Sequence, residues 1–169
     1  MKWIIPLAML FVLPLTAFAA PPKVSSQDRG WLIAAHQSNL AEIQSGNLAA
    51  QSGHSAAVRS AGQMLASDHQ SLDAKLKPVA KQLGVKLPSH PNAEQRHEMK
   101  KFKGASGMKF DQIWAHDEAG GHVKAIEMTK REINDGSSSE VKQLAQSTLP
   151  VLKKHLSTLH QASTEISGS

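Results

Sequence analysis

The chain has 169 residues, a formal net charge of +5 and neither cysteine nor tyrosine. The missing cysteine excludes disulfide bonds, thiolate metal ligands and a thiol nucleophile. Aromatic side chains are too few to offer a surface on which nucleic-acid bases would stack, so the composition argues against a nucleic-acid-binding protein.

Residues 1–19 have the pattern of a secretory signal peptide. A positive start at Lys2 is followed by the apolar residues 3–16, and Ala17-Phe18-Ala19 fits the small-x-small cleavage rule. The apolar run is too short to span a bilayer comfortably, and no second one follows. We therefore expect residues 20–169 to form one exported domain, periplasmic or secreted, without a transmembrane segment.

Helical periodicity dominates the rest of the chain, and Gly and Pro divide it into blocks. The predicted helices cover about residues 26–52, 55–83, 108–134 and 138–166, with a short basic helix at 92–103 inside the connection 84–107.

Boundary residues mark these blocks. Ser26 is a predicted N-cap, and Gly53 and Gly84 are predicted helix ends. Inside the second and fourth long helices, Pro78 and Pro150 predict a kink, bend or local break.

Two helical hairpins joined by a longer connection make an all-α four-helix bundle with a short extra helix between helices two and three. The sequence leaves open whether the connection 84–107 crosses the bundle's length, and so whether those two helices run parallel or antiparallel.

Each long helix carries a histidine near its middle on the face predicted to be buried: His36, His69, His122 and His155. Counting residues from the turns at Gly53 and Gly136 puts His36 level with His69, and Glu118 level with His155. His122 lies one turn from Glu118, and Asp68 and Glu42 flank the same faces. The pattern predicts a polar layer at mid-bundle formed by His36, Glu42, Asp68, His69, Glu118, His122 and His155.

This layer has two interpretations. Neutral imidazoles with one or two carboxylates would suit a transition metal such as zinc, copper or iron. Alternatively, the carboxylates accept hydrogen bonds from the histidines and fix helix register without a metal. A di-iron enzyme is disfavoured because the residues three before His69, His122 and His155 are Ala66, Ala119 and Leu152, so the Glu-x-x-His pairs are missing.

Ordered short motifs resemble those of the bacterial family known as domain of unknown function 4142, over about residues 28–162. They are Glu42-Ile43 and Leu48-Ala49, Ser67-Asp68-His69, Gly84-Val85-Lys86-Leu87-Pro88, Phe110-Asp111 with Trp114, His122, Leu149-Pro150-Val151-Leu152 and His155-Leu156.

The resemblance implies a ferritin-like bundle in an exported envelope protein with no settled activity. It also implies that Glu42, Asp68, His69, Asp111, His122 and His155 are recurrent polar positions, whereas His36 and Glu118 depart from the pattern. Our leading hypothesis is a non-catalytic periplasmic protein that binds a transition metal for storage, buffering or stress protection. The alternative is a metal-free structural or interaction module of the cell envelope, whose partner the sequence does not name.

Overall fold

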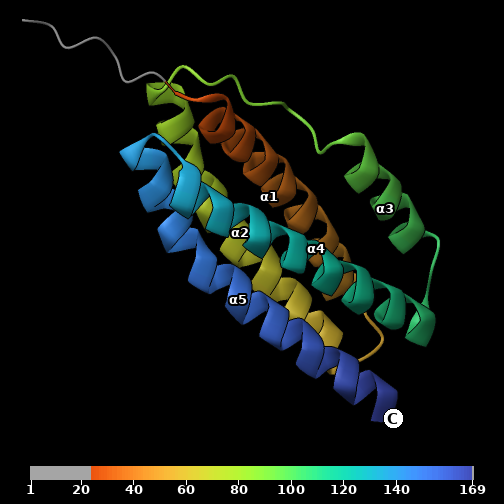
Figure 1. Cartoon of the computed structure of the whole chain (residues 1–169). Helices are drawn as coiled ribbons and strands as arrows, with labels where there is room; N and C mark the ends of the chain where they lie inside the picture. Colours follow the sequence, from red (N-terminus) through yellow and green to blue (C-terminus); the bar gives the residue numbers. More distant parts are fainter. Residues whose placement is uncertain (1–23, 169) are drawn as a thin grey trace, which may run out of the picture.

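The computed structural model describes residues 24–168, which form five helices and contain no strand. Four long helices pack as a bundle, and a short helix lies along its outside (Figure 1). The helices are α1 (Ser26–Ser52), α2 (Ala56–Gln82), α3 (Ala93–Lys103), α4 (Gly107–Asp135) and α5 (Ser139–Gly168). The all-α prediction is confirmed, whereas the predicted signal peptide lies outside the described residues.

The first hairpin consists of α1 and α2. Ser25, rather than the predicted Ser26, caps α1, and its side chain forms a reciprocal capping box with Asp28. Gly53 ends α1 as predicted. Where the two helices cross, Gly46 and Gly62 face one another so closely that a Cβ at either would meet the other's carbonyl oxygen at 2.7 or 2.6 Å. Glycine is therefore needed at this crossing.

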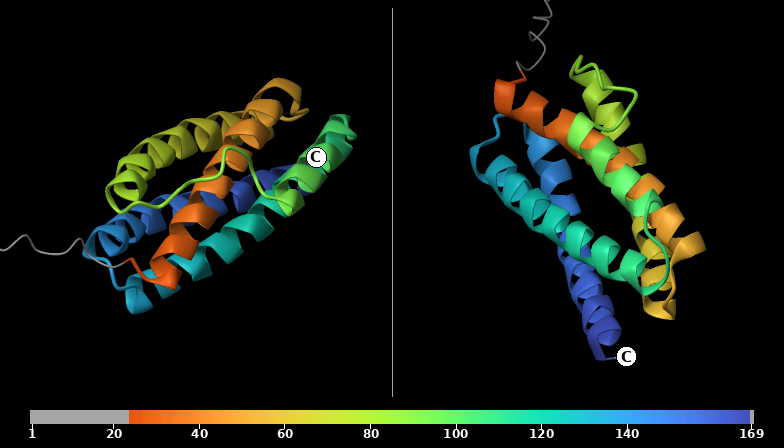
Figure 2. Two further views of the ribbon diagram at one scale, coloured as in Figure 1. Left: turned by 90° about the horizontal axis from the view of Figure 1, so that it is seen from above. Right: turned by 90° about the vertical axis from the view of Figure 1, so that its right-hand side faces the viewer.

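The connection between α2 and α4 travels the length of the bundle, which settles the question that the sequence left open. Asp111, near the start of α4, accepts hydrogen bonds from the backbone N–H groups of His54 and Ser55 in the α1–α2 turn. Because α2 ends at the opposite end of the bundle, residues 83–106 must run back along it, and they carry α3 on the way (Figure 2).

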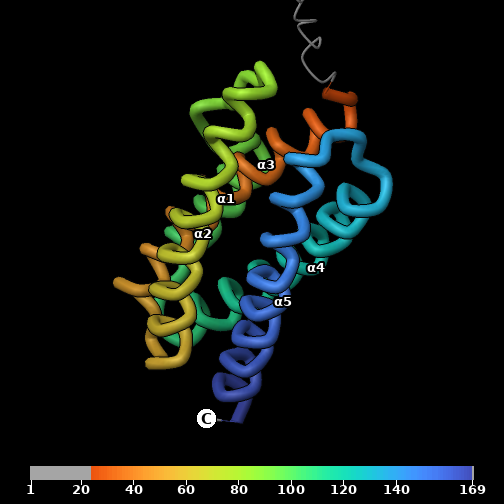
Figure 3. Tube along the Cα trace, turned by 90° about the vertical axis from the view of Figure 1, so that its left-hand side faces the viewer, coloured from red at the N-terminus to blue at the C-terminus, as the bar shows by residue number. Residues whose placement is uncertain are grey.

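Helices α2 and α4 consequently run parallel, and each hairpin is antiparallel (Figure 3). One long crossover in a four-helix bundle is the connectivity of ferritin-like folds. Neither Pro78 nor Pro150 interrupts its helix, so the local break considered for α2 does not occur. Within residues 24–168, no helix is long and apolar enough to cross a membrane.

The core has two apolar halves. One, next to the α1–α2 turn, includes Leu65, Phe110 and Trp114, and the other, next to the α4–α5 turn, includes Leu32 and Val141. Buried polar side chains lie between these halves: His36, Asn39, His69, Asp73, Glu118, His122, Thr148 and His155. The fold therefore places a polar layer at mid-height, as predicted.

Candidate metal centre

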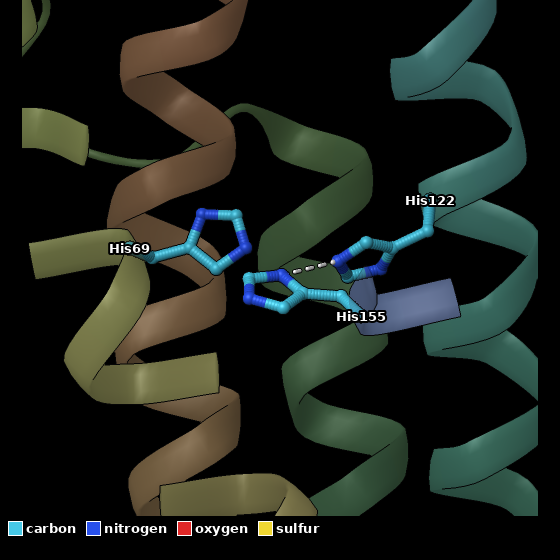
Figure 4. Close-up of side chains that lie close together, drawn as sticks. All are labelled: His69, His122 and His155. Carbon is cyan, nitrogen blue, oxygen red and sulfur yellow. Dashed lines mark hydrogen bonds between the residues drawn. The ribbon is translucent and has the colours of Figure 1, made fainter. Parts of the chain in front are cut away.

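Three histidines from three different helices meet in the polar layer. His69 comes from α2, His122 from α4 and His155 from α5, and their rings point toward one another (Figure 4). The ring centroids are 5.1 to 5.8 Å apart. All three residues are at most 2% exposed. One ring nitrogen from each lies within 4.8 Å of the other two, a spacing at which a single ion can be shared.

The outward-facing nitrogen of each ring is held by an oxygen acceptor. The Nδ1 of His69 is 2.9 Å from the amide oxygen of Asn39. The Nδ1 of His122 is 2.9 Å from the backbone carbonyl oxygen of Glu118, and the Nε2 of His155 is 3.0 Å from a carboxylate oxygen of Asp68. Because oxygens of these kinds accept, each outward nitrogen carries the proton and donates it. The inward nitrogens are then left with lone pairs.

The inward nitrogens lack ordinary partners. The Nε2 of His69 is buried without a hydrogen bond. The Nε2 of His122 faces the Nδ1 of His155 at 3.2 Å, so two lone pairs meet unless a shared proton or a cation lies between them. Two nitrogens bound to one tetrahedral ion at their usual bond length would be about 3.4 Å apart. The spacing of these nitrogens therefore suits a metal, and the outer acceptors orient the rings as they do around metal-binding histidines.

The protonation state also suits metal binding. Burial is the largest cause that lowers the pKa of His69, His122 and His155, and the neighbouring imidazoles lower that of His69 further. The hydrogen bond to Asp68 acts in the opposite direction on His155 without outweighing burial. All three rings are therefore neutral near pH 7, the form in which histidine ligates a metal.

A pair of carboxyl groups lies beside the histidines. Glu42 of α1 and Glu118 of α4 can each place an oxygen within 4.8 Å of a nitrogen of His122. Burial raises the pKa of Glu42 to about 7, and burial together with the charge of Glu42 raises that of Glu118 well above its usual value. One oxygen of Glu42, Oε2, is buried without a hydrogen bond.

His36 does not join this cluster, contrary to the predicted grouping. Its Nδ1 contacts Asp73 at 2.6 Å and its Nε2 contacts the carbonyl oxygen of Pro88 at 2.9 Å, so both nitrogens have partners. The predicted height of His36 along the bundle, level with His69, was wrong by about one helical turn. The register between two antiparallel helices is set by the residues that flank the turn, Ser52 and Ala56, and not by Gly53. In the second hairpin, similarly, His155 contacts His122 rather than Glu118.

Sequence reasoning missed two residues of the layer, Asn39 and Asp73. Both are buried and hydrogen-bonded to a histidine. Asn39 lies three residues after His36, and Asp73 four residues after His69, so each shares a helix face with a histidine that the sequence had singled out. Helical spacing of polar residues around those histidines was the signal that would have found them.

A cavity of about 670 Å³ opens beside the histidines, between α1, α3 and α4. Apolar side chains such as Trp31 and Phe102 form part of its wall, and Glu42 and Glu118 also line it. His69 and His122 contribute to the same wall. The cavity therefore connects the polar layer with the space beneath α3.

Comparison with solved structures gives the fold but not the role. The crystal structure of a DUF305 fragment from Deinococcus radiodurans superposes with a TM-score of 0.75 over 85% of this chain and 99% of that one. The two sequences are 12% identical, so the likeness is one of fold alone. No curated protein matches the chain. The family described as a domain of unknown function, DUF4142, matches residues 13–162, which include all the site residues above, and the chain therefore belongs to this family.

Proposed function

We propose that this protein is an exported, non-catalytic metal-binding protein that holds one transition-metal ion between His69, His122 and His155. The observation that carries the proposal is the arrangement of the ring nitrogens. Each outward nitrogen has an oxygen acceptor, and the inward nitrogens converge in a buried space. A layer built only to fix helix register has no reason to leave a nitrogen such as Nε2 of His69 without a partner.

The ligand set selects among metals. An all-imidazole site suits zinc, copper, iron or nickel, and divalent copper and zinc bind such donors most tightly of the common candidates. Three histidines with room for a fourth ligand form a set that zinc also uses elsewhere. Zinc and copper are therefore our first candidates, ahead of iron. The missing Glu-x-x-His pairs speak against a di-iron enzyme.

The proposed role is buffering of a metal in the bacterial envelope. Residues 1–19 are expected to direct export, and the mature protein would then work in the periplasm or outside the cell. One cluster of three histidines holds a single ion, which fits buffering or protection against excess metal better than bulk storage. Burial of the cluster would keep the bound ion away from other cell constituents.

Metal analysis tests the proposal directly. Protein purified from the periplasm without an affinity tag is stripped, titrated with Zn²⁺ or Cu²⁺ and analysed for bound metal. We expect one equivalent in the wild type, loss of binding in the His69→Ala, His155→Ala variant, and no change in the control His90→Ala, His160→Ala, whose residues are exposed. At an ion concentration about 100 times Kd, folding should gain about 2.7 kcal/mol in the wild type alone.

A wild type that folds fully and binds no metal stoichiometrically would contradict the proposal. It would favour the alternative of a metal-free structural or interaction module of the envelope. Circular dichroism of each variant checks that loss of metal does not follow from loss of fold.

A further inference from the structure

The three histidines are buried too deeply for an ion to reach them directly. Asp68 lies between His155 and solvent, and its side chain is 33% exposed. That side is less favourable for a cation, because the Nζ of the exposed Lys154 lies 3.5 Å from the same carboxylate oxygen that contacts His155. An approaching dication would meet the ammonium group of Lys154 and be repelled.

The cavity offers the opposite approach. It reaches His69 and His122, and the carboxyl groups of Glu42, Glu98 and Glu118 are part of its lining. Glu98 lies on α3 and is half-buried, whereas Glu42 and Glu118 lie next to the buried His122. Basic side chains also line the cavity, namely Arg96, Lys100, Lys103 and Lys124. A cation there therefore depends on direct binding by the carboxyl oxygens beside His122, and not on the field of the cavity as a whole.

We propose that a divalent transition-metal ion reaches the three histidines through this cavity, and that Glu42 and Glu118 bind it transiently on the way. This inference rests on the proposed function, since it describes how that site is filled. Glu42 and Glu118 would bind the ion only while it passes, and the histidine nitrogens would hold it at equilibrium.

The geometry supports a hand-over between the two sets of ligands. A hydrated dication binds carboxyl oxygens once it displaces their protons, and the Oε2 of Glu42 is buried without a hydrogen bond. The Oε1 of Glu42 lies 3.8 Å from Nδ1 of His122, so the carboxyl pair borders one edge of that ring while its Nε2 faces the metal cluster at the other. Zinc and copper prefer imidazole to carboxylate, and this preference would move the ion inward.

Stopped-flow loading of the stripped protein with Co²⁺ tests the inference, because cobalt bound by imidazoles has a characteristic visible spectrum. The association rate of the wild type is compared with that of the Glu42→Gln, Glu118→Gln variant. We expect the variant to load several-fold more slowly, because a glutamine amide cannot lose a proton and bind the ion as a carboxylate does. The matched control is Glu132→Gln, another buried carboxyl group, which does not line this cavity and should leave the rate unchanged.

A second variant tests the route by shape instead of charge. Gly121 lines the cavity, and a Cβ added there meets no atom within 4 Å. The Gly121→Leu variant places a larger side chain at the wall and should slow both association and release of Co²⁺.

The outcomes separate the two proposals. Wild-type protein that binds none of Co²⁺, Zn²⁺ and Cu²⁺ would overturn the proposed function together with this inference. If the wild type binds Co²⁺ and the glutamine variant loads within twofold of its rate, only the inference fails. Loss of equilibrium binding in that variant would also overturn it, because Glu42 and Glu118 would then be permanent ligands. Slower loading in both variants, with the control unaffected, supports it.

Discussion

The ends and the middle of the bundle bury polar groups in different ways. At one end, Asp28 is fully buried and accepts hydrogen bonds from the backbone N–H groups of Ser137 and Ser138 and from Ser25. At the other end, Asp111 is fully buried and accepts from the backbone of the α1–α2 turn. In the middle, by contrast, the inward nitrogen of His69 has no partner.

The difference shows which polar groups serve the fold. Asp28 and Asp111 each tie two segments of the chain together through groups that would otherwise be unsatisfied, so they stabilise the folded state. The histidines are held by hydrogen bonds from their outward nitrogens only, and the lone pairs of their inward nitrogens remain able to bind a metal ion. Four predictions test this division, from the largest expected effect to the smallest.

Removing an anchor at the end should cost the most. The Asp28→Ala substitution leaves the N–H groups of Ser137 and Ser138 without their acceptor and loses the capping box of α1. We expect the free energy of unfolding to fall by about 3 kcal/mol or more. Urea denaturation measures this loss, with the exposed Asp135→Ala as the control. A loss below about 1 kcal/mol would show that the end is not anchored in this way.

Replacing part of the middle should cost little stability but remove the metal. The His69→Leu, Asn39→Leu variant exchanges both members of a buried hydrogen bond for apolar side chains. Such exchanges are often neutral or stabilising, so we expect a change within about 1 kcal/mol in the metal-free protein and no stoichiometric metal. Denaturation and metal analysis of the same preparation measure both. A large loss of stability would place the histidine layer among the structural groups.

The stability that the three histidines contribute to the metal-free protein should fall as the pH falls from 7 toward 5. Burial lowers the folded-state pKa of His69, His122 and His155 below the unfolded-state value. Their contribution to the free energy of unfolding is present above the unfolded-state pKa and is lost as the pH falls. The reason is that the unfolded chain then binds protons that the folded chain does not. Denaturation midpoints across this range are compared with those of the His69→Leu, Asn39→Leu variant, because the raised pKa values of Glu42, Glu118 and Glu132 act in the opposite direction in both proteins. The wild type should lose stability relative to this variant as the pH falls. A wild type that gains stability relative to the variant on acidification would instead indicate charged histidine–carboxylate pairs.

Glu132 is an exception to the contrast between the ends and the middle, and its replacement should have the smallest effect on stability. Glu132 is buried near Asp28, and neither carboxyl oxygen has a hydrogen bond. Burial and the neighbouring Asp28 raise the pKa of Glu132 to about 7. Its contribution to stability is therefore present at pH 4.5 and lost as the pH rises through about 7.

The Glu132→Gln variant cannot ionise and should lose less stability than the wild type between pH 6 and 8. Equal slopes in the two proteins would show that Glu132 does not ionise in this range. Chemical denaturation at three pH values is sufficient to compare them.

Local features of the sequence predicted the helices well. Ser55 and Asn92 both cap helices where the predicted helical segments begin, and Gly84, with φ of 65°, follows the end of α2. Capping depends on residues three or four apart, so it can be read from a short window. The presence of histidines in a mid-bundle layer was predicted for the same reason, because a helix face follows from periodicity.

The membership of the candidate site was predicted only in part. His69, His122 and His155 meet, with Asp68, Glu42 and Glu118 near them. His36 lies apart with Asp73, and Asn39 takes the place beside His69. Which residues share a level depends on how a turn sets the register between two helices, and an error of one turn changes every contact across them.

The sequence by itself determined that this protein is all-α, approximately where its helices begin and end, and that histidines collect on their buried faces, because these properties depend on neighbours within a few turns. Only the tertiary structure decided that residues 83–106 cross the bundle, that α2 and α4 run parallel, and that three imidazoles rather than four converge. These properties depend on contacts between residues far apart in the chain, such as that of Asp111 with the α1–α2 turn, and no local pattern specifies them.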